Sequence, residues 1–418
     1  MYAGRFIAGL GVGQTPVVGP IYIAEVAPAS VRGLCTCMFT GAVYLGIVLA
    51  YFANYGCHLH ISVENQAQWL VPTSLHIIMS GLILILTLFQ SESPRFLMKQ
   101  GQTEKAIRSF AWLRNQPIDS DYVVREMASI QMALDQELEA SRGLGWAGKV
   151  KELLLDRGNL YKIYLSSAVQ LLSQWSGAGS ITIYAVDLFR LLGITGSSES
   201  LLVTAIFGVV KFICAMACAL FLVDYIGRKR SLLLGIALQT ISMVYVAAFL
   251  TASPQLGTNE AYSLPDSKRA ASRGAIAMLY ISGAGWALGW NSMQYLLTAE
   301  LYPLRIRALA TSWAMTLHFA NQYGNSRAVP NMLLRVSDGG ITPSGTFWCF
   351  GAITLLGGVW VWFFVPETGG RSLERMDRLF ELPWYRIGLY GNQDAEEKDS
   401  TLAEKEGTSG GLTREQGV

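Results

Sequence analysis

Residues 69–90, WLVPTSLHIIMSGLILILTLFQ, form one apolar run that contains no Asp, Glu, Lys or Arg. A helix of about 20 such residues is long enough to cross the hydrocarbon core of a bilayer. Eight further runs of about this length can be placed, at 3–24, 35–55, 160–187, 198–223, 231–252, 273–297, 307–325 and 345–365. Several contain Gly or Pro, which membrane helices tolerate. The sequence therefore predicts an all-α, multi-pass membrane protein with nine transmembrane helices.

The composition excludes most soluble functions. Of the 418 residues, 51% are hydrophobic and 15% are charged, whereas a soluble domain has about 25% charged residues. The net charge of +2 gives no reason to expect a nucleic-acid partner. The six cysteines and four histidines have no metal-like spacing. We therefore expect a lipid bilayer as partner, with no metal, no cofactor and no enzymatic activity.

The distribution of Lys and Arg between the apolar runs predicts the orientation in the membrane. The loop 56–68 contains neither residue, whereas the loop 224–230, DYIGRKR, contains three. The segment 91–158 and the tail from 367 are also rich in both. Because basic loops stay in the cytoplasm, we expect these segments, the loop 301–307 and the C-terminus there. The N-terminus then lies outside.

The segment 92–158 has the pattern of short helices. GQTEKAIRSFAWLRN (101–115) and DYVVREMASIQMALDQELEAS (121–141) place apolar residues at helical spacing among charged ones. We expect amphipathic helices on the cytoplasmic face, with a solvated charged linker as the alternative. After about residue 390 the tail 367–418 is polar and lacks aromatic residues, so we expect disorder there.

Six motifs follow one another in a fixed order, within the apolar runs and in the loops between them. They are GRFIAGLGVG…PIYIAEVAP…RG (4–33), ESPRFL (92–97), SGAGSITIY (176–184), DYIGRK (224–229), AELYPLRIRA (299–308) and PETGGRSLE (366–374). Over residues 2–380 the chain closely resembles the sugar porter family of the major facilitator superfamily, in its fungal form. The resemblance implies a bundle of twelve helices in two six-helix halves, joined by a large cytoplasmic loop between helices six and seven.

Within that frame the nine runs match helices four to twelve. The resemblance divides the chain into a remnant of the N-terminal half (1–91), the central loop (92–158), the C-terminal half (159–366) and the tail (367–418). A signal peptide at residues 4–28 is disfavoured because Gly and two Pro interrupt its core and Glu25 precedes the cleavage-like site. A nucleotide-binding loop is disfavoured because no strand precedes the glycines. We expect the opening stretch to be a fourth membrane helix without its first three.

Charged residues of opposite sign gather at the predicted cytoplasmic ends of the runs. Such pairs can lock two helix bundles together on one face and must open when the cavity faces inward. The resemblance assigns this gating role to Glu25, Arg32, Glu92, Arg95, Asp224, Arg228, Glu300, Arg307, Glu367 and Arg371. The alternative is simple interfacial anchoring. The family usually has an arginine at the place of Tyr225.

Three runs carry more polar side chains than lipid exposure would allow. A sugar requires amide, hydroxyl and indole groups inside a largely apolar cavity, and the midplane between the halves is where transporters place such sites. The predicted substrate-binding residues are Gln174, Ser176, Tyr184, Asn291, Gln294, Tyr295 and Asn321. The alternative is that they hydrogen-bond helices to one another.

The match to the family's substrate motif is incomplete. Ser173 and Gly179 stand where the family usually has a glutamine and an asparagine, and Thr40 replaces another sugar-binding glutamine. Tyr295 falls where a tryptophan usually stacks on the sugar. These differences indicate a substrate other than an ordinary hexose, weak binding, or a copy that no longer transports.

Two cations fall inside predicted spans. Arg5 lies near the outer end of the first span, and in proton-coupled members of the family this arginine pairs with an aspartate on helix one. Lys211 lies near the centre of the span 198–223, where an intramembrane ionisable group is by default a functional hypothesis. Contact with an acidic substrate is one role for Lys211, and snorkelling to an interface is the alternative.

These observations predict a secondary active transporter of a sugar, polyol or sugar acid, coupled to protons and located in the plasma membrane. Two alternatives remain open: a sensor that binds sugar without moving it, and a truncated, inactive carrier. Because nine spans would leave half of the cavity wall missing, we expect the 418-residue chain alone not to transport.

Overall fold

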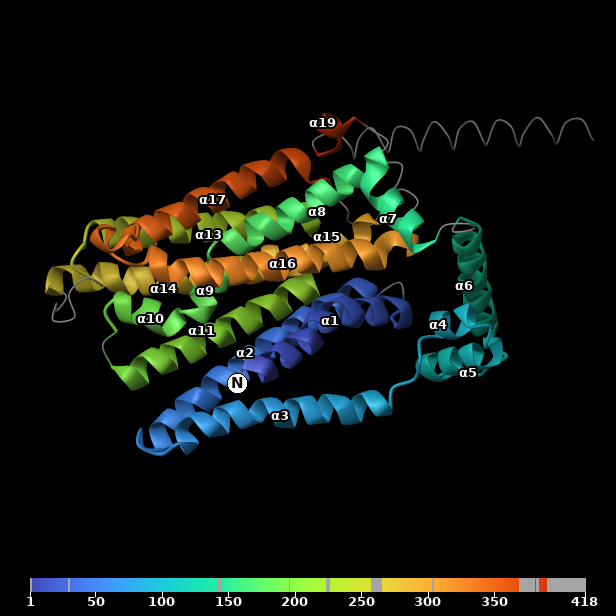
Figure 1. The fold of residues 1–418 in the computed structure, drawn as a ribbon, viewed down its shortest axis with the longest axis horizontal. Coiled ribbons are helices and arrows are strands. Elements are labelled where there is room, and N and C mark those ends of the chain that lie inside the picture. The colour runs from blue at the N-terminus through green and yellow to red at the C-terminus, as the bar shows by residue number, and fades with distance from the viewer. Residues whose placement is uncertain are drawn as a thin grey trace, which may run out of the picture.

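The computed structural model describes residues 2–28, 31–140, 145–194, 196–222, 226–256, 265–302, 304–367, 380 and 383–388. Within these ranges every regular element is a helix, which confirms the all-α prediction. The long helices lie along the longest axis of the molecule (Figure 1). The first three are α1 (Tyr2–Val26), α2 (Arg32–His60) and α3 (Ala67–Leu88).

A group of short helices follows at one end of the molecule (Figure 1). It contains α4 (Pro94–Lys99), α5 (Thr103–Arg114), α6 (Asp121–Ala140) and α7 (Trp146–Leu155). The apolar faces of α4, α5 and α6 form one cluster that includes Leu97, Phe110, Val123 and Met127. The predicted amphipathic helices at 101–115 and 121–141 are therefore confirmed as α5 and α6, and their apolar sides pack against one another.

The rest of the chain forms the larger part of the bundle. Its elements are α8 (Arg157–Trp175), α9 (Ala178–Ile183), α10 (Ala185–Leu191), α11 (Ser197–Ala217), the π-helix η1 (Cys218–Leu222), α13 (Arg228–Thr251), α14 (Asp266–Leu288), α15 (Trp290–Leu301), α16 (Leu304–Met332), the 3₁₀-helix η2 (Val336–Asp338), α17 (Thr342–Phe364) and α19 (Trp384–Ile387).

Six helices in the described ranges are long and apolar enough to cross a membrane: α1, α2, α3, α11, α13 and α17. The other three predicted spans are not single apolar helices. The span 160–187 is divided into α8, α9 and α10, the span 273–297 into α14 and α15, and the span 307–325 lies inside the longer, polar α16. The first break has a clear cause, because Gly177 between α8 and α9 has φ +85°, which a helix cannot contain.

Glycines bring α13 and α14 into backbone contact. A Cβ atom on Gly235 of α13 would lie 2.4 Å from the carbonyl oxygen of Gly285 and 2.5 Å from Cα of Gly289. Such small residues let membrane helices approach closely and gain van der Waals contact. The close approach fixes α14, and with it α15, against the centre of the bundle.

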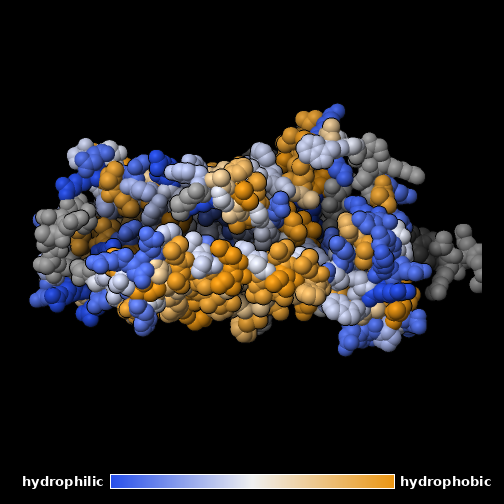
Figure 2. All heavy atoms as spheres, turned by 60° about the horizontal axis from the view of Figure 1, so that its bottom comes forward, coloured by the Kyte–Doolittle hydropathy of each residue, from blue (hydrophilic) through white to orange (hydrophobic). Residues whose placement is uncertain are grey.

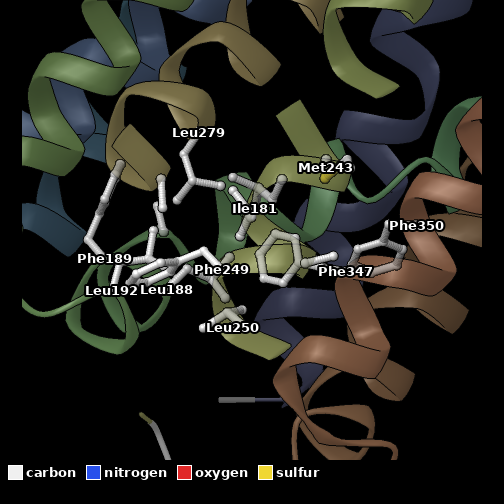
Figure 3. Close-up of a cluster of buried hydrophobic side chains, with 14 of the residues drawn as sticks. Ile181, Leu188, Phe189, Leu192, Met243, Phe249, Leu250, Leu279, Phe347 and Phe350 are labelled. Atoms are coloured by element: carbon white, nitrogen blue, oxygen red, sulfur yellow. The ribbon is translucent and has the colours of Figure 1, made fainter. Parts of the chain in front are cut away.

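An apolar cluster holds the short helices α9 and α10 in place. Ile181 and Phe189 from these helices pack with Met243 of α13, Leu279 of α14 and Phe347 of α17 (Figure 3). Phe189 and Phe207 meet edge to face, with ring centroids 6.1 Å apart. The broken helix therefore rests on a packed core.

The surface and the loop positions agree with a membrane protein. Apolar side chains gather along the middle of one face and hydrophilic ones at both ends (Figure 2), and α3 buries none of its residues. Leu153, Tyr302, Ile306, Phe380 and Ile387 share one cluster. The segments predicted to lie together in the cytoplasm therefore meet at one end of the molecule, called here the α4–α7 end.

Candidate functional site

The break between α8 and α9 faces a polar stretch of α16. Gln174 lies in the last turn of α8, and its amide nitrogen is 3.0 Å from Nδ1 of His318. Oε1 of Gln170 is also 3.0 Å from Nδ1 of His318. The Gln174 amide nitrogen also lies 3.4 Å from Nε2 of His318, so the tautomer of His318 decides which of its ring nitrogens accepts from Gln174. All three side chains are buried. The site thus contains a buried polar group of two amides and one imidazole.

Asn325, two turns further along α16, connects both sides of the break. Its amide nitrogen donates to the carbonyl oxygen of Gln174, and its Oδ1 accepts from the hydroxyl of Ser180 at 2.9 Å. Tyr184 donates to the carbonyl oxygen of Ser326 at 2.8 Å. The first of these bonds supplies a partner for the Gln174 carbonyl oxygen at the end of α8.

The helix α15 completes the site from the other side. The Ser173 hydroxyl donates to Oε1 of Gln294 at 3.1 Å, and the rings of Tyr295 and His318 lie 6.0 Å apart. Asn291, which is 8% exposed, has an amide nitrogen without a hydrogen-bond partner in the described part of the chain. The amide nitrogen of Gln170 likewise has no hydrogen-bond partner among the described residues.

The structure thus brings together six of the seven predicted substrate residues. Gln174, Tyr184, Gln294 and Tyr295 join the network above, and Asn321 accepts a bond from the indole of Trp175 at 3.2 Å. Asn291 lies in the first turn of α15, the helix that also carries Gln294 and Tyr295.

Ser176 behaves differently from the other six. Its hydroxyl accepts from the amide of Gln239 on α13 at 3.1 Å, and its carbonyl oxygen accepts from the same amide. It therefore faces the packing between α8 and α13, away from α16. Its predicted binding role finds no support in this geometry.

The amide and imidazole side chains of the network that the sequence-based selection of binding residues left out are those of Gln170, His318 and Asn325. His318, Asn321 and Asn325 are spaced three and four residues apart, and Gln170 precedes Gln174 by four. Residues at this spacing share one face of a helix. Polar periodicity along α8 and α16 would therefore have found them.

A cavity of about 290 Å³ lies between α1 and α16. Its polar lining comes from Gln14 on α1 and from Ser312 and Thr316 on α16, and Phe319 covers it beside His318. None of the residues that line it belongs to the polar network.

The two predicted intramembrane cations differ in their surroundings. Lys211 is 2% exposed and donates to the hydroxyl oxygen of Thr182 at 2.7 Å. Arg5 is exposed on α1 in the part of the chain that the structure describes. Its role in coupling stays a prediction.

The gate residues at the end of the first three helices form local bonds. The hydroxyl of Ser93 donates to the carboxylate of Glu25, and Arg114 of α5 donates to the carbonyl oxygen of Val26 at 2.9 Å. Glu92 is exposed, Arg95 is half-buried, and Arg32 opens α2. These contacts fasten the short helices of the α4–α7 end to α1.

The second set of gate residues surrounds the start of α13. Glu367 accepts from the backbone N–H groups of Arg228 at 2.7 Å and Lys229 at 3.1 Å, and the Lys229 ammonium donates to the carbonyl oxygen of Trp362 at 2.8 Å. A carboxylate at a helix N-terminus is favoured by the helix dipole. Arg307 donates to the carbonyl oxygen of Tyr302. The side chain of Glu300, and Asp224 and Arg371, lie outside the described residues.

Replacing Glu367 by alanine is expected to lower the free energy of unfolding by about 1–2 kcal/mol, because two N–H groups of α13 lose a charged acceptor. Thermal unfolding of the purified protein measures the change. Glu64→Ala, at an exposed loop position, serves as the control and should be neutral. Equal stability of the two variants would contradict the capping role.

The sequence profile of the family described as "Sugar (and other) transporter" matches residues 1–380. The chain belongs to this family. The match covers all of the helices that build the polar site. It confirms the resemblance on which the sequence-based expectations rested.

Individual relatives agree with the assignment. The quinate permease of Emericella nidulans is 31% identical over 99% of this chain and 76% of its own length. The probable quinate permease of Aspergillus niger is 32% identical over 91% of this chain and 68% of its own length. The structure of the proton:xylose symporter XylE bound to 6-bromo-6-deoxy-D-glucose matches with a TM-score of 0.72 and 26% identity, covering 90% of this chain and 73% of that chain.

Membership of this transporter family confirms the predicted fold and class of function. The chain is a multi-pass membrane protein with the major facilitator fold. It is a secondary transporter by family, and its relatives are permeases and symporters, not enzymes.

Proposed function

We propose that the protein binds a sugar-like polyol or sugar acid at the break between α8 and α9 and carries it across the plasma membrane together with protons. The midplane position of a broken helix is where transporters place such sites. Gln170, Gln174, Gln294, Asn291 and Asn321 would hydrogen-bond the hydroxyl groups of the substrate. Tyr295 would contact its apolar face.

The observation that carries the proposal is the set of buried amides with unused donors. The amide nitrogens of Asn291 and Gln170 find no acceptor in the part of the chain that the structure describes. A buried donor without an acceptor costs about 1–3 kcal/mol. A ring carrying several hydroxyl groups supplies acceptors that would remove this cost, which favours a polyol ligand.

The relatives support the same class of substrate. Two are named for quinate, and the structural neighbour is a xylose symporter that was solved with a modified glucose. Quinate, xylose and glucose all carry several hydroxyl groups on a six-membered ring. Proton coupling enters the proposal from the same neighbour, which is a proton symporter.

A sensor or an inactive carrier is the second candidate. The observation that favours it is that the side chains of Gln174, Gln294 and Asn325 already bond from helix to helix. Because these amides are already hydrogen-bonded within the protein, a ligand can bind to them only by replacing some of these bonds.

Asn291→Ala and Gln174→Ala separate binding from structural roles. Asn291→Ala is expected to weaken polyol binding about tenfold while leaving thermal stability unchanged or higher, because an unpaired buried amide is removed. Gln174→Ala is expected to lower stability by about 1–2 kcal/mol, because it breaks the bond to His318. Loss of stability without loss of affinity in Asn291→Ala would contradict its binding role.

Uptake of labelled quinate and xylose by cells that lack their own carriers then distinguishes the candidates. Saturable uptake that a protonophore abolishes supports a proton-coupled carrier, and contradicts the expectation that the 418-residue chain alone is inactive. Saturable binding without uptake supports the sensor or the inactive carrier.

A further inference from the structure

Lys211 is a buried charge without an acidic neighbour. It lies in the middle of α11, about three helical turns from the nearer end of the continuous run α11–η1, so its side chain cannot reach an interface by snorkelling. Among the described residues no Asp or Glu forms an ion pair with it. An unpaired ammonium at this depth costs about 2.5–3.5 kcal/mol on insertion scales.

The surroundings of the ammonium use only part of its bonding capacity. Of its three donors, one bonds the hydroxyl oxygen of Thr182 at 2.7 Å. The rings of Tyr44 and Phe207 lie with their centroids 5.0 Å and 5.4 Å from Nζ. Cation–π contacts of this kind stabilise the charge by about 0.5–2 kcal/mol each, but they leave two donors without an oxygen acceptor.

The stem of Lys211 packs closely against α14, and the acceptor of its ammonium is held by α2. Gly283 of α14 faces its stem, and a Cβ atom there would lie 3.1 Å from Cγ of Lys211 and 2.4 Å from Phe207. The acceptor Thr182 is fixed in turn, because the hydroxyl of Tyr51 on α2 donates to its carbonyl oxygen at 2.6 Å. Tyr44 and Tyr51 belong to the first half of the chain and Thr182 to the broken helix. The ammonium therefore lies where the two halves meet beside the proposed site.

We infer that Lys211 binds a carboxylate of the substrate, so that the substrates are polyhydroxylated carboxylic acids in preference to neutral sugars. This inference rests on the proposed function. A carboxylate oxygen accepting from Nζ forms a charge-assisted hydrogen bond, about twice as strong as a neutral one. A second carboxylate oxygen can accept from the remaining ammonium donor, whereas the hydroxyl of Thr182 already donates to the carbonyl oxygen of Ala178 at 2.9 Å. A neutral sugar leaves the lysine unpaired.

The test compares quinate with its uncharged amide, quinamide, as ligands of the purified wild-type protein in lipid nanodiscs. We expect quinate to bind at least tenfold more tightly, because the two ligands differ only in the group that meets Lys211. Equal affinity for the two ligands would overturn the inference, and this comparison needs no variant.

Variants of Lys211 then test whether this residue causes the preference for quinate over quinamide. Lys211→Met is expected to weaken quinate binding at least tenfold, to bring the two affinities close together, and to raise thermal stability, since it removes a lone buried charge. Lys211→Arg should keep a preference for the acid. A Lys211→Met protein that still prefers quinate would overturn the assignment. If the wild type binds xylose or glucose but not quinate, the inference fails and the proposed function stands; if it binds no polyol at all, the proposed function fails first.

Discussion

Gly235→Leu is expected to yield no stably folded protein. The first side-chain atom added at this position would lie 2.4–2.6 Å from backbone atoms of Gly285 on α14 and of Gly289, which directly follows α14. Backbone atoms cannot rotate away, so α13 and α14 would have to separate along their whole contact. Overpacking costs about 1–3 kcal/mol even where side chains can adjust, and we expect about 3 kcal/mol or more here.

Size-exclusion chromatography of the detergent-extracted protein measures the effect as loss of the monodisperse peak. Gly46→Leu is the matched control, because a Cβ on Gly46 of α2 meets nothing within 4 Å. This control should elute as the wild type does. A monodisperse Gly235→Leu protein of normal thermal stability would show that the two helices do not touch.

Gly177→Ala is expected to disrupt the break on which the polar site is built. Its φ of +85° costs an L-residue about 1–2 kcal/mol, and its Cβ would lie 2.5 Å from the ring of Phe350. Together these effects should lower the free energy of unfolding by about 2–5 kcal/mol. Polyol binding should fall with it, because Gln174 precedes the break by one turn.

Two comparisons divide this cost into its parts. Gly101 also has a positive φ, +76°, but nothing within 4 Å of its Cβ position, so Gly101→Ala should show the backbone cost alone. Adding Phe350→Ala to Gly177→Ala relieves the clash at the price of a cavity. If Gly177→Ala unfolds at the wild-type temperature, the break does not depend on this glycine.

The membrane fold was largely predictable because lipid imposes a strong constraint on sequence. Each run of about 20 apolar residues must become a helix, and the runs at 35–55, 69–90 and 345–365 did so as α2, α3 and α17. The amphipathic period of residues 101–141 was equally informative, since α5 and α6 bury one face each.

The helix breaks and the polar network could not be predicted from hydropathy. Hydropathy treats residues 160–187 as one span and does not reveal that Gly177 has a φ of +85° and separates α8 from α9. The partners of Gln174 and Ser176 lie on α16 and α13, which are far away in sequence. Composition identified the polar spans, and only the packing of helices showed that Ser176 faces α13 while Gln174 faces His318.

The central claim is that the polar groups around the α8–α9 break bind a polyhydroxylated ligand. Calorimetric titration of the purified chain in lipid nanodiscs with quinate tests it most directly, because binding is measured without transport. The account predicts saturable binding of one molecule per chain, weakened about tenfold by Asn291→Ala in a protein of undiminished stability. Absence of saturable binding for quinate, xylose and glucose alike, in a protein that is folded by thermal unfolding, would contradict it.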